Sequence, residues 1–306
     1  MCAKKDILAT LTYFDIFNYP VTYTEIFFFL SNHYSQEEFF EALQLLLKEE
    51  QIFQLDEFFS LQDDYQMVVR RRKGNVTAKK LLATAERIAL FLSSFPFVRG
   101  IAVSGSLSKN FADDKSDVDF FIITAKNRLW IARTFMHLFK KLTFLLNKQH
   151  LFCMNYYVDE EGLEIKEKNI YTATELATLL PLRGTTAFQA LYNSNLWSKD
   201  FLPNHISRLH AKEVKTTVLK KLIEWCLGNS LGDAIDFLCM KITANRWRKK
   251  TRQRKLNANG NIMGMDAHKH YAKPDPRTFQ NKFIDTYKKT VVHVLNKYEQ
   301  RLKPVY

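Results

Sequence analysis

The stretch from 103 to 124, which reads VSGSLSKNFADDKSDVDFFIIT, constrains the fold of this chain more than any other segment. An apolar run over 98–103 is followed by a glycine and serine turn, and ten residues separate Ser106 from a second run that begins at Asp117. Glycine lets the backbone turn sharply, and short apolar runs between turn residues are typical of buried strands. The pattern predicts a strand, a turn with a short helix, and a second strand that starts at Asp117.

Two carboxylates stand at the start of the second predicted strand. Because side chains alternate along a strand, Asp117 and Asp119 are expected to project together from one face. Carboxylate oxygens suit Mg²⁺, which proteins usually hold through one or two carboxylates together with substrate phosphates. The turn at Gly105 and Ser106 offers backbone N–H groups and a hydroxyl to a phosphate, with Lys109 as a further phosphate contact. The segment therefore predicts adjoining metal and phosphate sites.

The ordered set of these groups carries a family resemblance. Gly105-Ser106, ten intervening residues and then Asp117-Val118-Asp119 in an apolar strand resemble the signature of the DNA polymerase β-like nucleotidyltransferase superfamily. The resemblance covers residues 77–170, about a third of the chain. It implies an α+β fold with a short mixed sheet, a nucleoside triphosphate substrate, and Mg²⁺ or Mn²⁺ held by the two aspartates.

In this superfamily a third carboxylate usually stands on a later strand and helps to deprotonate the attacking hydroxyl. The run LFCMNYYV over 151–158 predicts that strand, and alignment on it places Asn155 where the acid is expected. An amide cannot act as a general base at neutral pH. Either the metal or a carboxylate from elsewhere takes this role, or the site binds nucleotide without transferring it. Glu164 and Glu167 are candidate replacements, but we interpret them as solvated charges of a hairpin.

The first 65 residues form a separate pattern. Three helices are expected over 5–17, 22–30 and 35–50, the last two with Thr and Ser caps, followed by a pair of strands over 51–61. Three helices and a hairpin resemble a winged helix-turn-helix domain. However, the segment holds three basic and twelve acidic residues, and binding to nucleic acid depends heavily on Lys and Arg. We therefore expect a packing or protein-interaction role and not DNA binding.

The domain boundaries follow from turn signals. The basic run over 70–75 ends in glycine and asparagine and predicts a hinge. The expected parts are a winged-helix-like domain over 1–72, a nucleotidyltransferase domain over 73–180 and a helical domain over 181–306. The segment 257–276 is rich in Asn and Gly and predicts a mobile loop, with a lid as one role. His268 and His270 within this loop are interpreted as surface residues.

The helical C-terminal part combines packing signals with basic charge. A long helical stretch is expected over 213–255 with an interruption at 228–230, and a final helix over 279–302. Seven apolar positions of the long stretch recur at helical spacing and predict a packed face: Val214, Val218, Leu222, Trp225, Leu231, Ile235 and Leu238. Residues 241–306 hold seventeen basic and four acidic residues around Trp247. This surface suits an RNA acceptor, a solvated helix, or contact with an acidic domain of another subunit.

The expected cellular setting is the reduced cytoplasm. The four cysteines have no metal or redox spacing, and the apolar segment 129–146 is interrupted by basic residues, as in an amphipathic helix and not a membrane span. We predict a cytoplasmic metal-dependent nucleotidyltransferase that moves a nucleoside monophosphate to a hydroxyl acceptor, whether RNA, small molecule or protein. The alternative is a weak or inactive nucleotide-binding regulatory protein whose winged helix recruits a partner.

Overall fold

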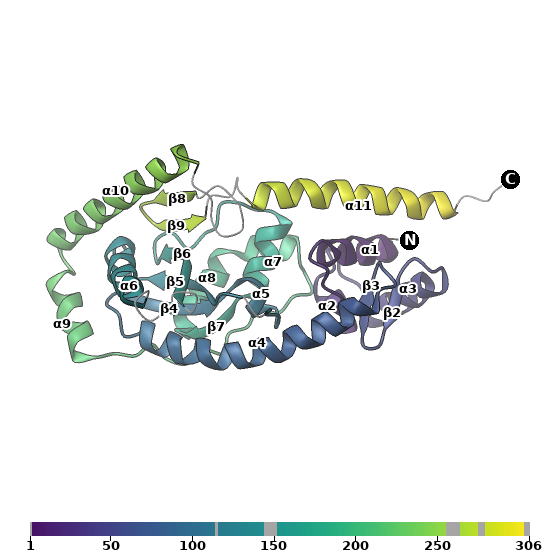
Figure 1. The fold of residues 1–306 in the computed structure, drawn as a ribbon, viewed down its shortest axis with the longest axis horizontal. Coiled ribbons are helices and arrows are strands. Elements are labelled where there is room, and N and C mark those ends of the chain that lie inside the picture. Colours follow the sequence, from purple (N-terminus) through teal and green to yellow (C-terminus); the bar gives the residue numbers. More distant parts are fainter. Residues whose placement is uncertain (1, 114–115, 144–151, 255–263, 275–278, 303–306) are drawn as a thin grey trace.

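The computed structural model describes residues 2–113, 116–143, 152–254, 264–274 and 279–302 (Figure 1). The described part is an α+β molecule, which confirms the predicted class. A six-stranded sheet with surrounding helices forms one end of the elongated molecule, and a three-stranded sheet with three helices forms the other. One long helix, α4 (Tyr65–Leu92), runs along the molecule between the two ends.

The N-terminal module, residues 2–64, consists of the predicted helices and hairpin in the predicted order. Its elements are α1 (Cys2–Asp15), β1 (Val21–Thr22), α2 (Tyr23–Phe28), α3 (Gln36–Lys48), β2 (Phe53–Leu55) and β3 (Phe58–Ser60). Thr22 and Ser35 cap α2 and α3, and a glutamate three residues later completes a capping box in each case. β3 pairs antiparallel with both β1 and β2, so the hairpin gains a third strand that the sequence pattern does not indicate.

The hinge predicted over 70–75 is wrong, because α4 is one continuous helix of 28 residues that passes through it. The basic side chains contact the N-terminal module and not solvent alone. Arg71 is buried and pairs with Glu25 at 2.8 Å, and its guanidinium carbon lies 3.6 Å from the centroid of the Tyr19 ring. The predicted boundary between 72 and 73 therefore falls inside a helix that joins the two parts stiffly.

The glycine in the predicted hinge has a packing role instead. Gly74 lies inside α4, where a Cβ atom would stand 2.3 Å from the ring of Phe111. The Gly74 carbonyl also accepts a hydrogen bond of 3.2 Å from the Ala112 N–H. Glycine is needed here because the loop after the phosphate turn packs directly on the helix backbone.

The large sheet has the order β7-β4-β5-β6-β9-β8. Its strands are β4 (Val98–Val103), β5 (Asp119–Thr124), β6 (Cys153–Asp159), β7 (Leu180–Arg183), β8 (Met265–His268) and β9 (Tyr271–Pro274). β5 and β6 are parallel and are connected through α6 (Leu129–Thr143), while the other pairs are antiparallel. The strand expected over 98–103 is confirmed, and the next one begins at Asp119 and not at Asp117. The sheet is mixed, as expected.

Two predictions for the C-terminal part fail because strands occur in it. β7 includes Pro181 and lies across the boundary predicted between 180 and 181. β8 and β9 lie within the predicted loop over 257–276, and β9 pairs with β6 and β8 with β9, so this segment extends the sheet where it is described; residues 257–263 and 275–276 lie outside the described residues. His270 is not a free surface residue, because its Nδ1 lies 2.9 Å from a carboxylate oxygen of the fully buried Asp159. His268 is exposed, as expected.

The remaining helices complete both ends of the molecule. They are α5 (Gly105–Ser108), α7 (Ile170–Thr178), α8 (Thr185–Ser194), α9 (Val218–Cys226), α10 (Ser230–Arg252) and α11 (Gln280–Leu302), with the 3₁₀ helix η3 (Leu196–Asp200). The final helix expected over 279–302 is confirmed, but it packs along α1 and belongs to the core of the N-terminal module. The ring centroids of Phe283 and Tyr13 are 5.0 Å apart. The last described helix therefore contributes to the core of the module that begins the sequence.

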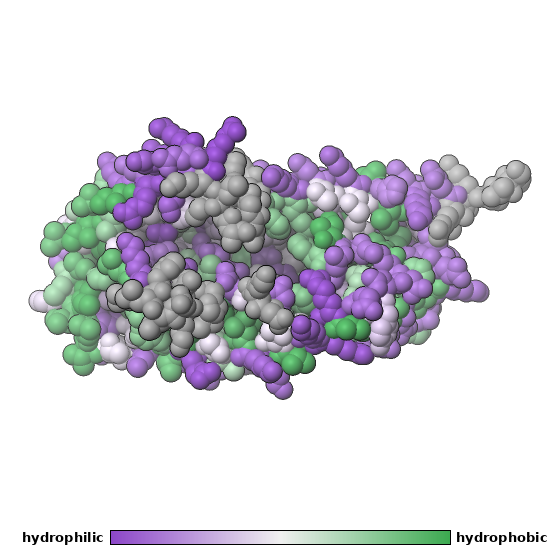
Figure 2. Space-filling view, viewed as in Figure 1, coloured by the Kyte–Doolittle hydropathy of each residue, from purple (hydrophilic) through white to green (hydrophobic). Residues whose placement is uncertain are grey.

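The helices expected on either side of 228–230 are confirmed as α9 and α10, but the packed face predicted for them is wrong at five of its seven positions. Ile235 does pack against a buried cluster. Val218 is 85% exposed and Trp225 is 79% exposed, and Leu222, Leu231 and Leu238 are exposed as well. Figure 2 shows hydrophobic residues on the surface at this end of the molecule. None of the described helices is long and apolar enough to cross a membrane.

Candidate active site

The turn between β4 and α5 is built against a carboxylate. Gly105 has a φ of +69°, which favours glycine, and a Cβ atom there would lie 3.0 Å from Asp119 Oδ2. The Ser104 N–H donates a hydrogen bond of 2.9 Å to the Asp119 carbonyl, which joins the turn to the start of β5. The glycine and the carboxylate that the sequence pattern paired are therefore in direct contact.

Asp119 is the more enclosed of the two predicted metal ligands. Burial raises the pKa of its carboxyl group to about 6, and the nearby charges of Asp117 and Glu175 act in the same direction. Asp117 lies two residues before the strand and is exposed, so it does not begin β5 as predicted.

Asn155 lies at the position expected from the alignment on β6. The register between β5 and β6 shifts after Phe120, so Asn155 is the extra residue of a bulge opposite the start of β5. Its Nδ2 donates a hydrogen bond of 2.6 Å to Asp119 Oδ1. Its Oδ1 lies 3.2 Å from the Cys153 sulfur. The amide of Asn155 therefore acts as a hydrogen-bond donor to the carboxylate of Asp119.

Lys109 is held by an acid that the sequence pattern did not indicate. Its ammonium donates to Glu175 Oε1 at 2.7 Å and to the Gly105 carbonyl at 3.1 Å. Glu175 comes from α7, where six of the nine residues are buried and every residue other than Glu175 is uncharged. A single charged residue in an otherwise uncharged and largely buried helix is the sequence signal that could have indicated Glu175 as a functional residue. Lys109 therefore lies at the Gly105 turn, and its charge is balanced by Glu175.

Two adjoining cavities open at this turn. The first has a volume of about 410 Å³ and the second of about 350 Å³. Gly105, Tyr171, Glu175 and Phe279 line both of them. The first cavity also contains Asp119 and Asn155, whereas Ser106 and Lys109 line the second. Asp119 and the phosphate-binding candidates thus meet at the junction of the two spaces, whereas Asp117 lines neither of them.

The N-terminal module forms part of the second cavity. Its aromatic residues Tyr13, Phe14, Phe17 and Tyr19 line this space together with Arg70, Phe111 and Phe279. These residues come from segments far apart in the sequence, so no local pattern could have predicted the cavity. The module that resembles a winged helix is therefore a wall of the candidate site and not a separate attachment.

The candidate replacements for the third carboxylate lie in different places. Residues 163–169 form bends and irregular structure, so the predicted return strand is wrong, and β9 takes that edge of β6. Glu167 lines the first cavity and forms an ion pair with the buried Lys273. Glu164 pairs with Lys168 at 2.7 Å, and both of these side chains are exposed. Interpretation as a solvated charge holds for Glu164 but not for Glu167.

The basic end of α10 lies outside both cavities. Lys250 lies over Trp247, with its ammonium 4.6 Å from the centroid of the ring. Neither cavity is lined by a described residue of α10. The geometry of the described residues therefore gives no direct connection between this surface and the candidate site.

The donor set at the junction fits Mg²⁺ in part. Within the described residues, no group of three or more His, Cys, Asp and Glu side chains could hold a metal by itself. Mg²⁺ commonly uses only one or two carboxylates and completes its coordination with water and substrate phosphates. Asp119 lies at the junction beside the Gly105 turn, and the exposed Asp117 lies two residues before it in the sequence. Metal binding is therefore expected to depend on a bound phosphate ligand.

We compared the chain with protein-family models, with curated proteins and with solved structures, and none of them matches it.

Proposed function

We propose that this protein is a metal-dependent nucleotidyltransferase that moves a nucleoside monophosphate from a nucleoside triphosphate to a hydroxyl acceptor. The observation that supports this function best is the contact between the Gly105 turn and the Asp119 carboxylate. A glycine in the left-handed region, a carboxylate within van der Waals distance of it, and a second carboxylate two residues earlier combine phosphate binding with metal binding. An ordinary turn before a strand, with no ligand to bind, does not require this combination.

The residues of the turn bind and orient the triphosphate. Backbone N–H groups at Gly105 and Ser106 and the Ser106 hydroxyl contact the β- and γ-phosphates, and Lys109 adds positive charge from the second cavity. Asp117 and Asp119 would hold the metal. When bound, Mg²⁺ would neutralise charge on the phosphates and lower the pKa of the acceptor hydroxyl. The contribution of the protein is positioning and charge neutralisation, as in phosphoryl transfer generally.

The leaving and entering groups indicate where an acceptor binds. In an in-line displacement the acceptor oxygen approaches opposite to the leaving pyrophosphate. With the pyrophosphate at Ser106 and Lys109, in the second cavity, the acceptor approaches from the first cavity, beside Asp119. A space of about 410 Å³ suits a small molecule better than RNA or protein. The lining by Asn155, Glu167 and Lys273 offers polar contacts to such an acceptor.

The second candidate function is nucleotide binding without turnover, in a regulatory protein of the same fold. The amide of Asn155 favours it, because this side chain cannot accept the proton of the attacking hydroxyl. Glu167 and Glu175 line the same cavity as Asp119 and could supply the missing base. The two functions differ in whether pyrophosphate is released.

The test compares the wild type with Asp119→Asn in the presence of Mg²⁺ and α-labelled nucleoside triphosphates. The acceptors offered are amino sugars, simple alcohols, RNA and the protein itself. We expect magnesium-dependent release of pyrophosphate that Asp119→Asn abolishes and that the matched surface change Glu164→Gln leaves intact. Binding of a nonhydrolysable triphosphate analogue without any pyrophosphate release would favour the regulatory function. Equal labelling by the wild type and Asp119→Asn would exclude the proposed site.

A further inference from the structure

Glu175 lies on the side of α7 that faces the first cavity. The residues of this segment that line the cavity recur at helical spacing and so share one side of the helix: Tyr171, Thr172, Glu175, Leu176 and Leu179. The Asn169 side chain caps the start of α7, and six of the nine residues of the helix are buried. The helix is therefore held firmly in place, and its only carboxylate is presented to the cavity.

A single ammonium group joins Glu175 to the Gly105 turn. The Lys109 Nζ lies 2.7 Å from Glu175 Oε1 and 3.1 Å from the Gly105 carbonyl oxygen. The Asp119 carboxylate lies against the same turn. Glu175 lines both cavities, whereas Asp119 lines the first and Lys109 the second. Glu175 is therefore placed between the lysine proposed to contact phosphate and the carboxylate proposed to hold the metal.

The first cavity contains one further acid, Glu167, and this acid is paired in a different way. Glu167 forms an ion pair with Lys273, whose side chain is buried and whose ammonium also lies 3.9 Å from Asp266 Oδ2. Neither Glu167 nor Lys273 lines the second cavity. A triphosphate at the Gly105 turn would therefore leave this ion pair intact, so Glu167 stays neutralised while Glu175 does not.

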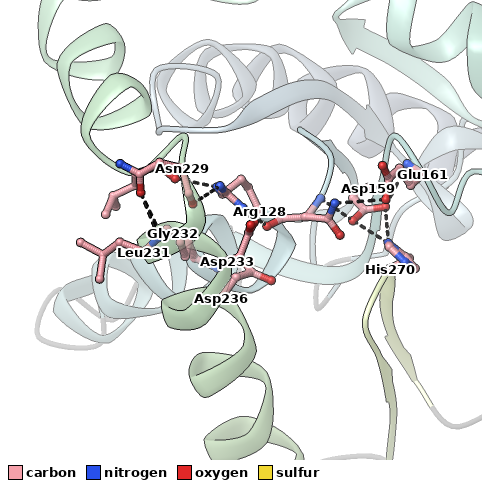
Figure 3. Close-up of polar contacts among 12 residues, drawn as sticks. Arg128, Asp159, Glu161, Asn229, Leu231, Gly232, Asp233, Asp236 and His270 are labelled. Carbon is pink, nitrogen blue, oxygen red and sulfur yellow. Dashed lines mark hydrogen bonds and ion pairs between the residues drawn. The ribbon is translucent and has the colours of Figure 1, made fainter.

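An ion pair outside the cavities shows what a structural pair looks like in this protein. Arg128, which is buried, donates to the carboxylate of Asp233 and joins the start of α10 to the loop after β5 (Figure 3). Its guanidinium also donates to three backbone carbonyls, so a change of partner would leave several buried donors unsatisfied. The ammonium of Lys109 loses one ion pair when it changes partner, which makes exchange feasible at the cavity junction.

We propose that Glu175 is the general base of the transfer and that the bound triphosphate releases it from Lys109, an inference that rests on the proposed function. The charged phosphates at the Gly105 turn attract the Lys109 ammonium, because such pairs are strong charge-assisted contacts. A carboxylate paired with an ammonium accepts a proton less readily than a free one. The base therefore becomes active only when the triphosphate is bound, and it supplies the acid that Asn155 lacks.

In the transfer step Glu175 accepts the proton of the acceptor hydroxyl while the acceptor oxygen forms its bond to the α-phosphorus. The bond from the α-phosphorus to the oxygen that bridges to the β-phosphate breaks, and the electron pair leaves with pyrophosphate. The Glu175 side chain is 28% exposed, so its proton can pass to solvent. Departure of pyrophosphate then allows Lys109 to pair with Glu175 again.

The first measurement compares rates of pyrophosphate release at saturating Mg²⁺ and nucleoside triphosphate, with the acceptors named above. Glu175→Gln keeps the size of the side chain but cannot accept the proton, so the rate should fall by about 100-fold or more. Glu175→Asp keeps a carboxylate and should retain part of the rate. Glu164→Gln, an exposed position outside both cavity linings, is the matched control and should keep the wild-type rate. Circular dichroism checks that each variant is folded.

The second measurement requires no turnover. The wild type, Lys109→Gln, Glu175→Gln and the double variant are titrated calorimetrically with a nonhydrolysable triphosphate analogue and Mg²⁺. In the wild type the ammonium must leave Glu175 to reach the phosphates, whereas in Glu175→Gln it has no carboxylate to leave. Lys109→Gln should therefore weaken binding more in the Glu175→Gln background than in the wild type, by about threefold or more. Equal effects in the two backgrounds would show that Lys109 does not change partners.

The two measurements also separate this proposal from the proposed function. A wild type that binds the analogue but releases no pyrophosphate would contradict the transfer function, and the base role of Glu175 with it. Pyrophosphate release that is as fast in Glu175→Gln as in the wild type would contradict the base role alone. A larger loss of rate in Glu167→Gln than in Glu175→Gln would likewise overturn the proposal, because it would identify Glu167 as the base.

Discussion

The Asn155 side chain donates a hydrogen bond of 2.6 Å to the carboxylate of Asp119. The donor fixes one carboxylate oxygen, and the other, Oδ2, faces the Gly105 turn. The pair thus resembles a two-carboxylate site in which one acid has been replaced by its amide. Restoring the acid should make the stability of the protein depend on metal.

Asn155→Asp would place two carboxylates at hydrogen-bonding distance in a partly buried site. Like charges so close raise the pKa of the pair, and we expect a loss of about 1–3 kcal/mol in the free energy of unfolding at neutral pH without metal. Mg²⁺ together with a nucleoside triphosphate should recover most of this loss. Thermal unfolding with and without both ligands measures the effect. A variant as stable as the wild type that gains nothing from Mg²⁺ would argue against a metal site at Asp119.

The raised pKa of Asp119 predicts how stability depends on pH. The pKa is about 6 in the folded protein, against an ordinary value of 3.8 for an aspartate in an unfolded chain, so the folded state binds more protons between these values. The contribution of Asp119 to stability should therefore fall as pH rises from about 4 to about 6. Asp119→Asn removes this dependence and should be more stable above pH 6, by about 3 kcal/mol at most. Urea unfolding of both proteins at several pH values tests it, and parallel profiles would contradict the assignment.

The same pKa governs ligand binding. Because a metal binds the deprotonated carboxylate, the affinity for Mg²⁺ and triphosphate should fall as pH drops through about 6. Calorimetric titration from about pH 5 to about pH 8 covers the transition. The affinity of Glu164→Gln should follow the wild-type profile, since this residue lies outside the cavity linings. An affinity that stays constant across the range would show that Asp119 does not contact the ligand.

Gly105→Ala tests the phosphate turn. The left-handed backbone at +69° costs a residue with a Cβ atom about 1–2 kcal/mol, and the new methyl would press on Asp119 Oδ2. Triphosphate binding should weaken by more than this loss of stability, because the turn and the carboxylate would both move. Ser106→Ala, which removes only a hydroxyl, should weaken binding without the same loss of stability. If both variants lost the same affinity for triphosphate and the same stability, binding would not depend on the backbone conformation at Gly105.

Because Phe111 packs on Gly74, the effect of Gly74→Ala on stability should change sign when Phe111 is also replaced by Ala. Gly74→Ala alone should destabilise the protein by about 1–3 kcal/mol, because the methyl meets the ring at 2.3 Å. In a Phe111→Ala background the ring is gone, and the same change should stabilise the protein by about 1 kcal/mol through helix propensity. Chemical unfolding of the four proteins gives the coupling. Additive effects would mean that α4 and the loop over 111–113 do not pack as described.

Local signals in the sequence predict the elements well and their partners poorly. The capping boxes at Thr22 and Ser35 are present as predicted, because they depend only on residues close in the sequence. The same holds for the strand before the Gly105 turn. The basic run over 70–75 is misleading, because a buried guanidinium and a close-packed glycine have the same local pattern as a solvated hinge. The apolar spacing in α9 is misleading for a related reason. It predicts that the apolar residues share one face of the helix but not whether that face points to the core or to solvent.

The candidate site shows the same limit. Gly105, Ser106, Asp117, Asp119 and Asn155 come from one strand-turn-strand unit and its neighbouring strand, so spacing and alignment could select them. The rest of the site is assembled from distant segments. Glu175 comes from α7, Lys273 from β9, and the aromatic wall from the N-terminal module. Their positions depend on tertiary packing that no periodicity in a single sequence encodes.

The packing of α11 along α1 has a consequence for the order in which the protein can fold. During synthesis the N-terminal module emerges well before α11, which supplies aromatic partners of its Tyr13 and Phe17 rings. Until then the nascent chain exposes these aromatic residues, together with one wall of the second cavity. Chaperone dependence and protease sensitivity should therefore persist until the final helix has left the ribosome. A ribosome-bound chain stalled before Gln280 is the species in which to measure both.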